Sequence, residues 1–284
     1  MISLAAGAGE WFRWLTFPFL RRALLVGVLV TLCAALLGVT LVLRRFSMIG
    51  DGLSHIGFGA LSVAAALHWA PMPVAIPAVI LAAFLLLRGS ERGLLRGDAA
   101  VALLSTSCLA VGVLAVSLGG GSNIDLMNYM FGSILSLGPE DVWLSLGVSA
   151  LVLVLFLWTY HRIFAVTFDE TFARATGARA SLHQLLLAVL TALTVVLGMR
   201  MMGTLLISSL VIFPALIAMR VCKSFRAVTV CAAAVSVLCF LVGFALSCLL
   251  PRGLPTGATI VATDLAAFAL FALAGRLRAR TRVH

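Results

Sequence analysis

The sequence is poor in charged residues, and most of those it has are basic. Only 11% of its 284 residues are charged, 63% are hydrophobic, and the mean hydropathy is +1.18. About a quarter of the residues of a typical soluble domain are charged. This composition therefore excludes a soluble domain and indicates a polytopic membrane protein. The net charge of +10 does not indicate nucleic-acid binding, because the basic residues stand in small groups between apolar runs.

Motifs for several chemistries are also missing. The only lysine, Lys223, precedes Ser224 but lacks the glycines of a phosphate-binding loop. The chain contains no G-x-S-x-G elbow and no H-E-x-x-H, which argues against serine and zinc proteases. The six cysteines form no C-x-x-C pair and lie mostly in apolar runs, so we expect small core residues rather than disulfides or a zinc framework.

Nine apolar stretches predict an all-α polytopic membrane protein with about eight or nine transmembrane helices. They cover residues 23–43, 53–69, 72–87, 99–118, 142–160, 182–199, 202–219, 227–249 and 258–275. The predicted organisation is an outer or interfacial segment (1–22), a transmembrane domain (23–275) and a basic cytoplasmic tail (276–284). No small-residue cleavage site accompanies the first stretch, so we do not expect a removed signal peptide.

The basic residues predict the orientation of the chain in the membrane. Connections on one side hold fifteen of the 20: Arg44, Arg45, Arg88, Arg92, Arg96, Arg162, Arg174, Arg179, Arg220, Lys223, Arg226, Arg276, Arg278, Arg280 and Arg282. The other side holds Arg13, Arg21, Arg22, Arg200 and Arg252. Because cytoplasmic loops carry the excess of lysine and arginine, we expect the C-terminus in the cytoplasm and, with nine spans, the N-terminus outside.

Asp51 and His55 stand at the head of the second stretch, in the run Met48-Ile-Gly-Asp-Gly-Leu-Ser-His-Ile-Gly-Phe-Gly59. A spacing of four places both side chains on one helix face, one turn apart. Carboxylate and imidazole are ligands that zinc accepts, and ionisable groups at membrane depth usually have a function. The alternative is that Asp51 caps the helix at the cytoplasmic surface while His55 packs in the bundle; the spacing does not separate the two.

Two further acidic residues are weaker candidates for a pathway. Asp125 lies with Asn128 in the polar, glycine-rich segment 119–139, which we interpret as a re-entrant or broken helix, or as a plain outer loop. Asp264 lies in the last apolar stretch. It could in principle share a proton with Asp51 in a protease-like pair, but no motif surrounds it.

The cytoplasmic connection after the fifth stretch contains a predicted short helix. Asp169 and Glu170 favour its beginning, and Gly177 favours its end. Phe168 and Phe172 are four apart and would share one face, which predicts an apolar contact with a soluble partner. The alternative is an interfacial helix lying against the bilayer.

Five motifs in one order resemble the membrane permease subunits of bacterial zinc/manganese ABC importers, over nearly the whole chain. They are LRRFSMIGDGLSH (43–55), DLMNYMFGS (125–133), FDETFARATG (168–177), GMRMMGTLLISSLVIFPA (198–215) and PTGATIV (255–261). After His55 many members continue with Ala-Val-Leu-Pro-Gly, whereas this chain has Ile-Gly-Phe-Gly-Ala. The resemblance therefore identifies the family and not the metal.

The resemblance implies a type II ABC importer permease fold in the bacterial cytoplasmic membrane. Two permease chains, expected as a homodimer surrounded by membrane lipid, would form the pathway. An extracytoplasmic metal-binding protein would deliver the ion, and a separate cytoplasmic ATPase would use ATP and contact the coupling helix at 168–177. The chain itself would be a transport subunit, not an enzyme, with no permanently bound cofactor and no nucleic-acid partner.

The transported ion is expected to be Zn²⁺, with Mn²⁺ or Fe²⁺ as alternatives. Two copies of Asp51 and His55 would give two oxygen and two nitrogen ligands, which suits zinc, whereas oxygen from Asp125 or Asp264 would favour manganese. The rival function is a proton- or sodium-coupled secondary transporter in which Asp51 carries the proton. Such transporters often contain internal repeats, and we find no convincing repeat here.

Overall fold

Nine α-helices make up the regular structure of the residues that the computed structural model describes. These residues are 17–46, 48–91, 97–119, 139–169, 180–249 and 254–280, together with Gly132 and Ala173. The helices are α2 (Pro18–Leu43), α3 (Ile49–Ala66), α4 (Pro71–Glu91), α5 (Gly97–Leu118), α7 (Pro139–Phe168), α9 (Ala180–Met202), α10 (Thr204–Val221), α11 (Phe225–Leu249) and α12 (Thr256–Arg280). Each overlaps one predicted stretch, which confirms the all-α class.

Seven of these helices are long and apolar enough to cross a membrane: α2, α5, α7, α9, α10, α11 and α12. The other two fall short for different reasons. The apolar part of α4, Pro71–Leu86, is short, and α3 carries Asp51, His55 and four glycines. A polytopic membrane protein is therefore confirmed, with α3 and α4 outside the set of helices that meet the criteria for a span.

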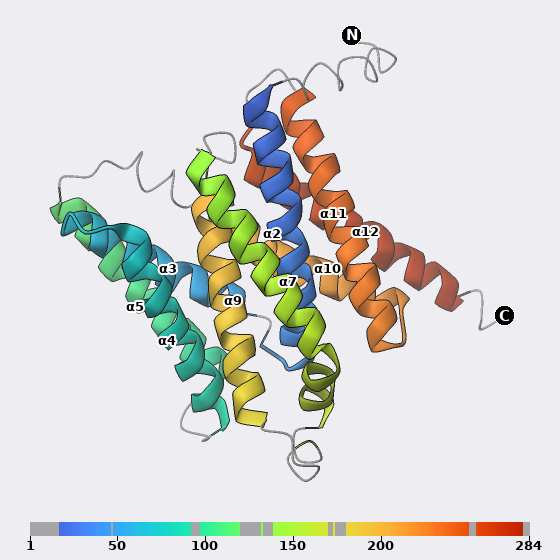
Figure 1. Ribbon diagram of the computed structural model, residues 1–284. Coiled ribbons are helices and arrows are strands. Elements are labelled where there is room, and N and C mark those ends of the chain that lie inside the picture. Colours follow the sequence, from blue (N-terminus) through green and yellow to red (C-terminus); the bar gives the residue numbers. More distant parts are fainter. Residues whose placement is uncertain are drawn as a thin grey trace.

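Helix α10 lies in the middle of the arrangement. It packs against α2, α3, α9, α11 and α12. Figure 1 shows α3, α4 and α5 grouped on one side, α2, α7 and α9 in the centre, and α11 and α12 on the other side, with α12 slanting outward. Because α10 contacts both sides, it connects the two outer groups of helices.

Successive helices in the second half of the chain alternate in direction. Figure 1 shows the C-terminal ends of α7 and α10 at the lower end of the bundle, together with the N-terminal ends of α9 and α11. The helix ends that flank these two connections therefore lie at the same end of the bundle. The basic residues predicted that these two connections share one side of the membrane, and the helix directions agree.

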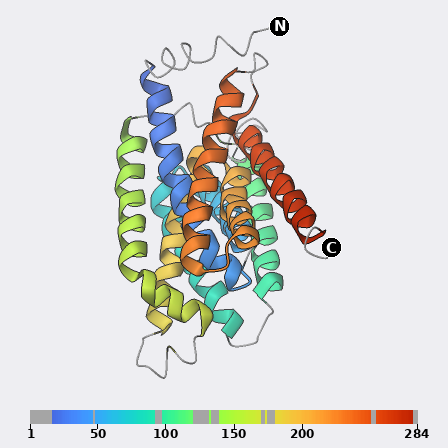
Figure 2. The same cartoon turned by 90° about the vertical axis from the view of Figure 1, so that its right-hand side faces the viewer.

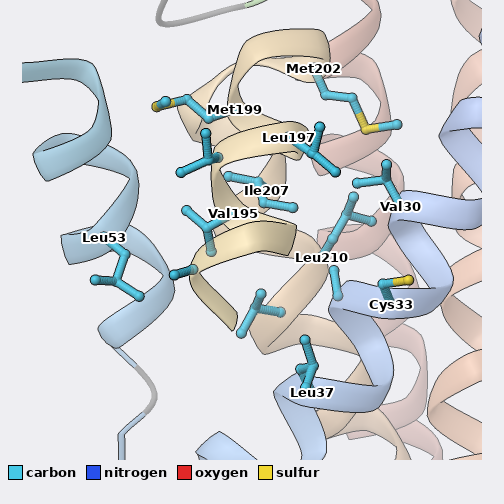
Figure 3. Close-up of a cluster of buried hydrophobic side chains, with 14 of the residues drawn as sticks. Val30, Cys33, Leu37, Leu53, Val195, Leu197, Met199, Met202, Ile207 and Leu210 are labelled. Carbon is cyan, nitrogen blue, oxygen red and sulfur yellow. The ribbon is translucent and has the colours of Figure 1, made fainter. Parts of the chain in front are cut away.

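The core lies where α2, α9 and α10 meet. Figure 3 shows its apolar side chains interlocking, among them Val30, Cys33 and Leu37 of α2, Val195 and Leu197 of α9, and Ile207 and Leu210 of α10. Packing of this kind holds helices together in lipid, where hydrophobic burial alone gives little preference for protein over acyl chains. All six cysteines are free, as the sequence predicted, and Cys33 belongs to this core.

Helices α3 and α5 approach one another at a glycine. A Cβ added at Gly59 would collide with the backbone carbonyl of Cys108, and one added at Gly112 would lie 2.8 Å from the Gly59 Cα. Phe58, the neighbouring residue, is buried. The segment Ile-Gly-Phe-Gly-Ala after His55 therefore forms a close helix contact of the small-residue type seen in membranes.

A single residue, Gly203, separates α9 from α10. Its φ of +87° is a conformation that glycine adopts without the steric cost of a Cβ. Gly132 lies against this break, because a Cβ there would meet the backbone of Met202 and Gly203. Gly132 belongs to the predicted re-entrant segment; most of that segment, including Asp125 and Asn128, lies outside the described residues.

We expect Gly59→Ala to destabilise the protein by roughly 1–3 kcal/mol, because the new methyl group meets backbone that cannot move cheaply. The matched control is Gly147→Ala in α7, where a Cβ has no neighbour within 4 Å. That change should be neutral or stabilising by up to about 1 kcal/mol, since alanine is the better helix former. Thermal unfolding of the two purified variants in one detergent checks the prediction, and equal midpoints would contradict it.

Candidate metal site

The first turn of α3 lies inside the bundle rather than at its end. Figures 1 and 2 both show the lower end of α2 and the beginning of α3 above the lower ends of α4 and α9. Asp51 lies in this first turn, where its charge suits the positive end of the helix dipole. The N-cap residue is Met48, which makes no side-chain cap hydrogen bond.

The Asp51 carboxylate contacts two other side chains, one through each oxygen. Ser208 of α10 donates its hydroxyl proton to Oδ1 over 3.1 Å. The other oxygen, Oδ2, lies 3.6 Å from His55 Nε2, one helical turn further along α3. The spacing of four thus brings Asp51 and His55 together as the sequence predicted. Besides favouring the N-terminus of α3, the Asp51 carboxylate therefore also connects α3 to α10 through its hydrogen bond with Ser208.

The Asp51–His55 pair is partly exposed. The Asp51 side chain is 40% exposed and that of His55 is 21% exposed, so neither side chain is sealed inside the bundle. The other imidazole nitrogen, Nδ1, is buried and has no hydrogen-bond partner within the described part of the chain. One oxygen and one nitrogen at this separation can chelate a borderline divalent ion after a small closing movement.

The described part of the chain offers this pair no third ligand. Among the described residues no group of three or more His, Cys, Asp and Glu side chains could hold a metal ion. Zinc in a closed site takes four protein ligands. The Asp51–His55 pair is therefore either a weak two-ligand site or one part of a site completed from elsewhere.

Asp264 lies in a separate place. It is fully buried on α12, where Ser209 donates to its Oδ2 over 3.3 Å and the Cys239 thiol lies beside it. Its Oδ1 has no hydrogen-bond partner among the described residues. This carboxylate does not form a metal-holding group with Asp51 and His55, and its hydrogen bond through Oδ2 is to Ser209 rather than to Asp51.

The two serines that hold these carboxylates had no role in the sequence interpretation. Ser208 and Ser209 are consecutive on α10, within the motif at 198–215. The sequence did contain a signal for them. Two adjacent hydroxyls in an apolar stretch point about 100° apart around the helix, so they contact different neighbours. The sequence did not show which neighbours these are.

Helix α7 continues past the predicted end of its stretch at residue 160 and reaches Phe168. Phe168 is thus in the last turn of a long helix and not in a separate short one. Its ring centroid lies 4.9 Å from that of Phe164 and 5.9 Å from that of Phe225 at the start of α11. Figure 2 shows these last turns of α7 bending across the lower end of the bundle.

The rest of the predicted coupling segment is described only in part. The Ala173 N–H donates to the Asp169 carbonyl over 3.0 Å, a hydrogen bond of helical spacing. Ala173 is buried with Val166 and Ala180. Glu170, Phe172 and Gly177 lie outside the described residues.

Comparisons with known proteins point to one family. The family model described as the ABC 3 transport family matches residues 16–275. The manganese import system permease protein ScaB of Streptococcus gordonii is 28% identical over 256 residues, 89% of this chain and 90% of ScaB. The high-affinity zinc uptake system membrane protein ZnuB of Haemophilus influenzae is 30% identical over 232 residues, 81% of this chain and 88% of ZnuB.

A solved structure has the same fold. It is PsaBC from Streptococcus pneumoniae in complex with Fab, and it matches with a TM-score of 0.82 at 27% identity. The match covers 93% of this chain and 94% of that chain.

Proposed function

The chain belongs to the ABC 3 transport family, and we propose that it is the membrane permease of an ATP-driven importer whose substrate is Zn²⁺. Its relatives are permease subunits of manganese and zinc importers, so it is a transport subunit and not an enzyme. The observation that carries the proposal is the Asp51–His55 pair inside the bundle. A secondary transporter is set aside, because the family and its named members belong to ABC transport.

The proposed transit site is shared between two copies of the chain. One copy offers one carboxylate and one imidazole. A second copy related by two-fold symmetry would present the same pair and complete a set of two oxygens and two nitrogens. This set suits tetrahedral zinc better than manganese, which prefers a shell rich in oxygen.

The openness of the pair suits transport. An ion must bind strongly enough to enter a pathway and weakly enough to leave it. Two ligands per chain on one short helix, without a third nearby among the described residues, give a site that a small helix movement takes apart. A resident cofactor is not part of the proposal, and Zn²⁺ is the substrate that passes through.

Partners follow from the same assignment. We place the end of the bundle that carries the basic connections in the cytoplasm, where residues 168–177 would contact a separate ATPase. A metal-binding protein would deliver the ion at the opposite end. The exposed Phe168 ring, which packs against Phe164 and Phe225, belongs to the described part of the proposed ATPase contact.

Removing either ligand should abolish transport without affecting insertion into the membrane. We expect Asp51→Ala and His55→Ala to lose uptake of radioactive zinc in whole cells, because each removes a direct ligand. The control is His68→Ala, which removes an exposed histidine just beyond the end of α3 and should leave uptake unchanged. Zinc uptake at the normal rate in either ligand variant would refute the assignment.

Charge at the proposed ATPase contact should release the partner. We expect Phe168→Asp to prevent co-purification of the ATPase, because it places a carboxylate on an apolar contact surface. Ser224→Asp is the matched control: it adds the same charge at an exposed position at the same end. It also keeps an acceptor for the Ala227 N–H that Ser224 Oγ now binds. Equal ATPase recovery with both variants would place the contact elsewhere.

The choice of zinc is tested by growth. A strain lacking this chain should fail to grow when zinc is chelated and should recover when zinc, but not manganese or iron, is restored. The mixed nitrogen and oxygen ligand set is the physical reason. Rescue by manganese or iron but not by zinc would change the substrate and leave the permease assignment in place.

A further inference from the structure

Two consecutive serines of α10 each hold a carboxylate on a different helix. Ser208 Oγ lies 3.1 Å from Asp51 Oδ1 on α3, and Ser209 Oγ lies 3.3 Å from Asp264 Oδ2 on α12. Helix α10 packs against both of these helices. The angular position of α10 around its own axis therefore determines both contacts at once.

Each serine also has a second acceptor within its own helix. Ser208 Oγ is 2.9 Å from the Thr204 carbonyl, and Ser209 Oγ is 2.9 Å from the Leu206 carbonyl. A hydroxyl has one proton and donates to one acceptor at a time. The carboxylate contacts are therefore not forced by the helix, and a small rotation of α10 would leave each serine bonded only to its own backbone.

Asp264 is costly where it lies. Its side chain is fully buried among α10, α11 and α12, and its Oδ1 has no hydrogen-bond partner in the described part of the chain. Burying a polar atom without a partner costs free energy, and more so inside a membrane. Two side chains of the described residues hydrogen-bond to this carboxylate, the Cys239 thiol and the Ser209 hydroxyl.

We propose that Asp264 is a positioning residue for metal transit. It fixes α10 against α12 through Ser209, and this orients Ser208 toward Oδ1 of Asp51. With Oδ1 held, Oδ2 is the oxygen that faces His55 Nε2. The inference rests on the proposed function, because it needs Asp51 to be a metal ligand. It assigns Asp264 no contact with the ion.

The test measures zinc uptake by the complete transporter, with its ATPase and metal-binding protein, over a range of zinc concentrations. We expect Ser209→Ala and Asp264→Ala to lower the maximal rate about fivefold, the size expected for the loss of one hydrogen bond. The half-saturating zinc concentration should stay unchanged, because the outer protein captures the ion. Asp264→Asn should restore a near-normal rate, because the amide oxygen still accepts the Ser209 proton.

A matched control separates this role from general packing. Ser236→Ala removes another buried hydroxyl, on α11, whose acceptor is the Thr31 carbonyl of α2 at 3.5 Å. It should leave the maximal rate unchanged. Asp51→Ala in the same series tests the proposed function. Normal uptake by this variant would refute the metal site itself. If this variant loses uptake, the other variants decide the Asp264 inference.

A double mutant tests whether the effect passes through Ser208. If Ser209 acts by orienting Ser208, the double variant Ser208→Ala, Ser209→Ala should transport at the rate of Ser208→Ala alone. If the rate losses of the two single variants multiply in the double variant, the two serines act independently, and the proposal is overturned. A normal rate in Asp264→Ala would also overturn it. So would an Asp264→Asn variant as slow as Asp264→Ala, because the charge rather than the hydrogen bond would then be needed.

Discussion

The central packing of α10 is the constraint on which the candidate site depends. This helix contacts α2, α3, α9, α11 and α12, and two of those contacts include a serine hydroxyl bonded to a carboxylate. In an apolar bundle a polar group can find a hydrogen-bond partner only inside the protein, because lipid offers none. The position of α10 therefore decides which polar groups of the surrounding helices are satisfied.

Helix α3 can carry ionisable side chains because other helices enclose it. It packs against α4, α5, α9 and α10, and the contact at Gly59 brings the α5 backbone close. The face that carries Asp51 and His55 is left partly open, with the Asp51 side chain 40% exposed. A helix that faced lipid on all sides would not tolerate this pair. The close glycine contacts of α3 with its neighbours are therefore part of what allows this helix to carry polar residues.

Aromatic side chains connect two helices at one end of the bundle. At one end, the aromatic rings of Phe164, Phe168 and Phe225 join the last turn of α7 to the start of α11. Helix α11 in turn packs on α10 and α12. Under the proposed function, a movement of the ATPase contact would reach the helices around the transit site through packed side chains, without any need for a flexible linker.

The sequence by itself determined the all-α membrane class, the approximate places of nine helices, the family and the shared face of Asp51 and His55. Apolar runs and a spacing of four are properties of a single helix, and those can be inferred locally. The predicted end of α7, residue 160, was wrong by eight residues, because the helix continues to Phe168 beyond its apolar run. Only the tertiary structure decided that Ser208 meets Asp51 and that Ser209 meets Asp264. These partners are 157 and 55 residues apart in the chain, and which helices become neighbours depends on how their side chains pack together.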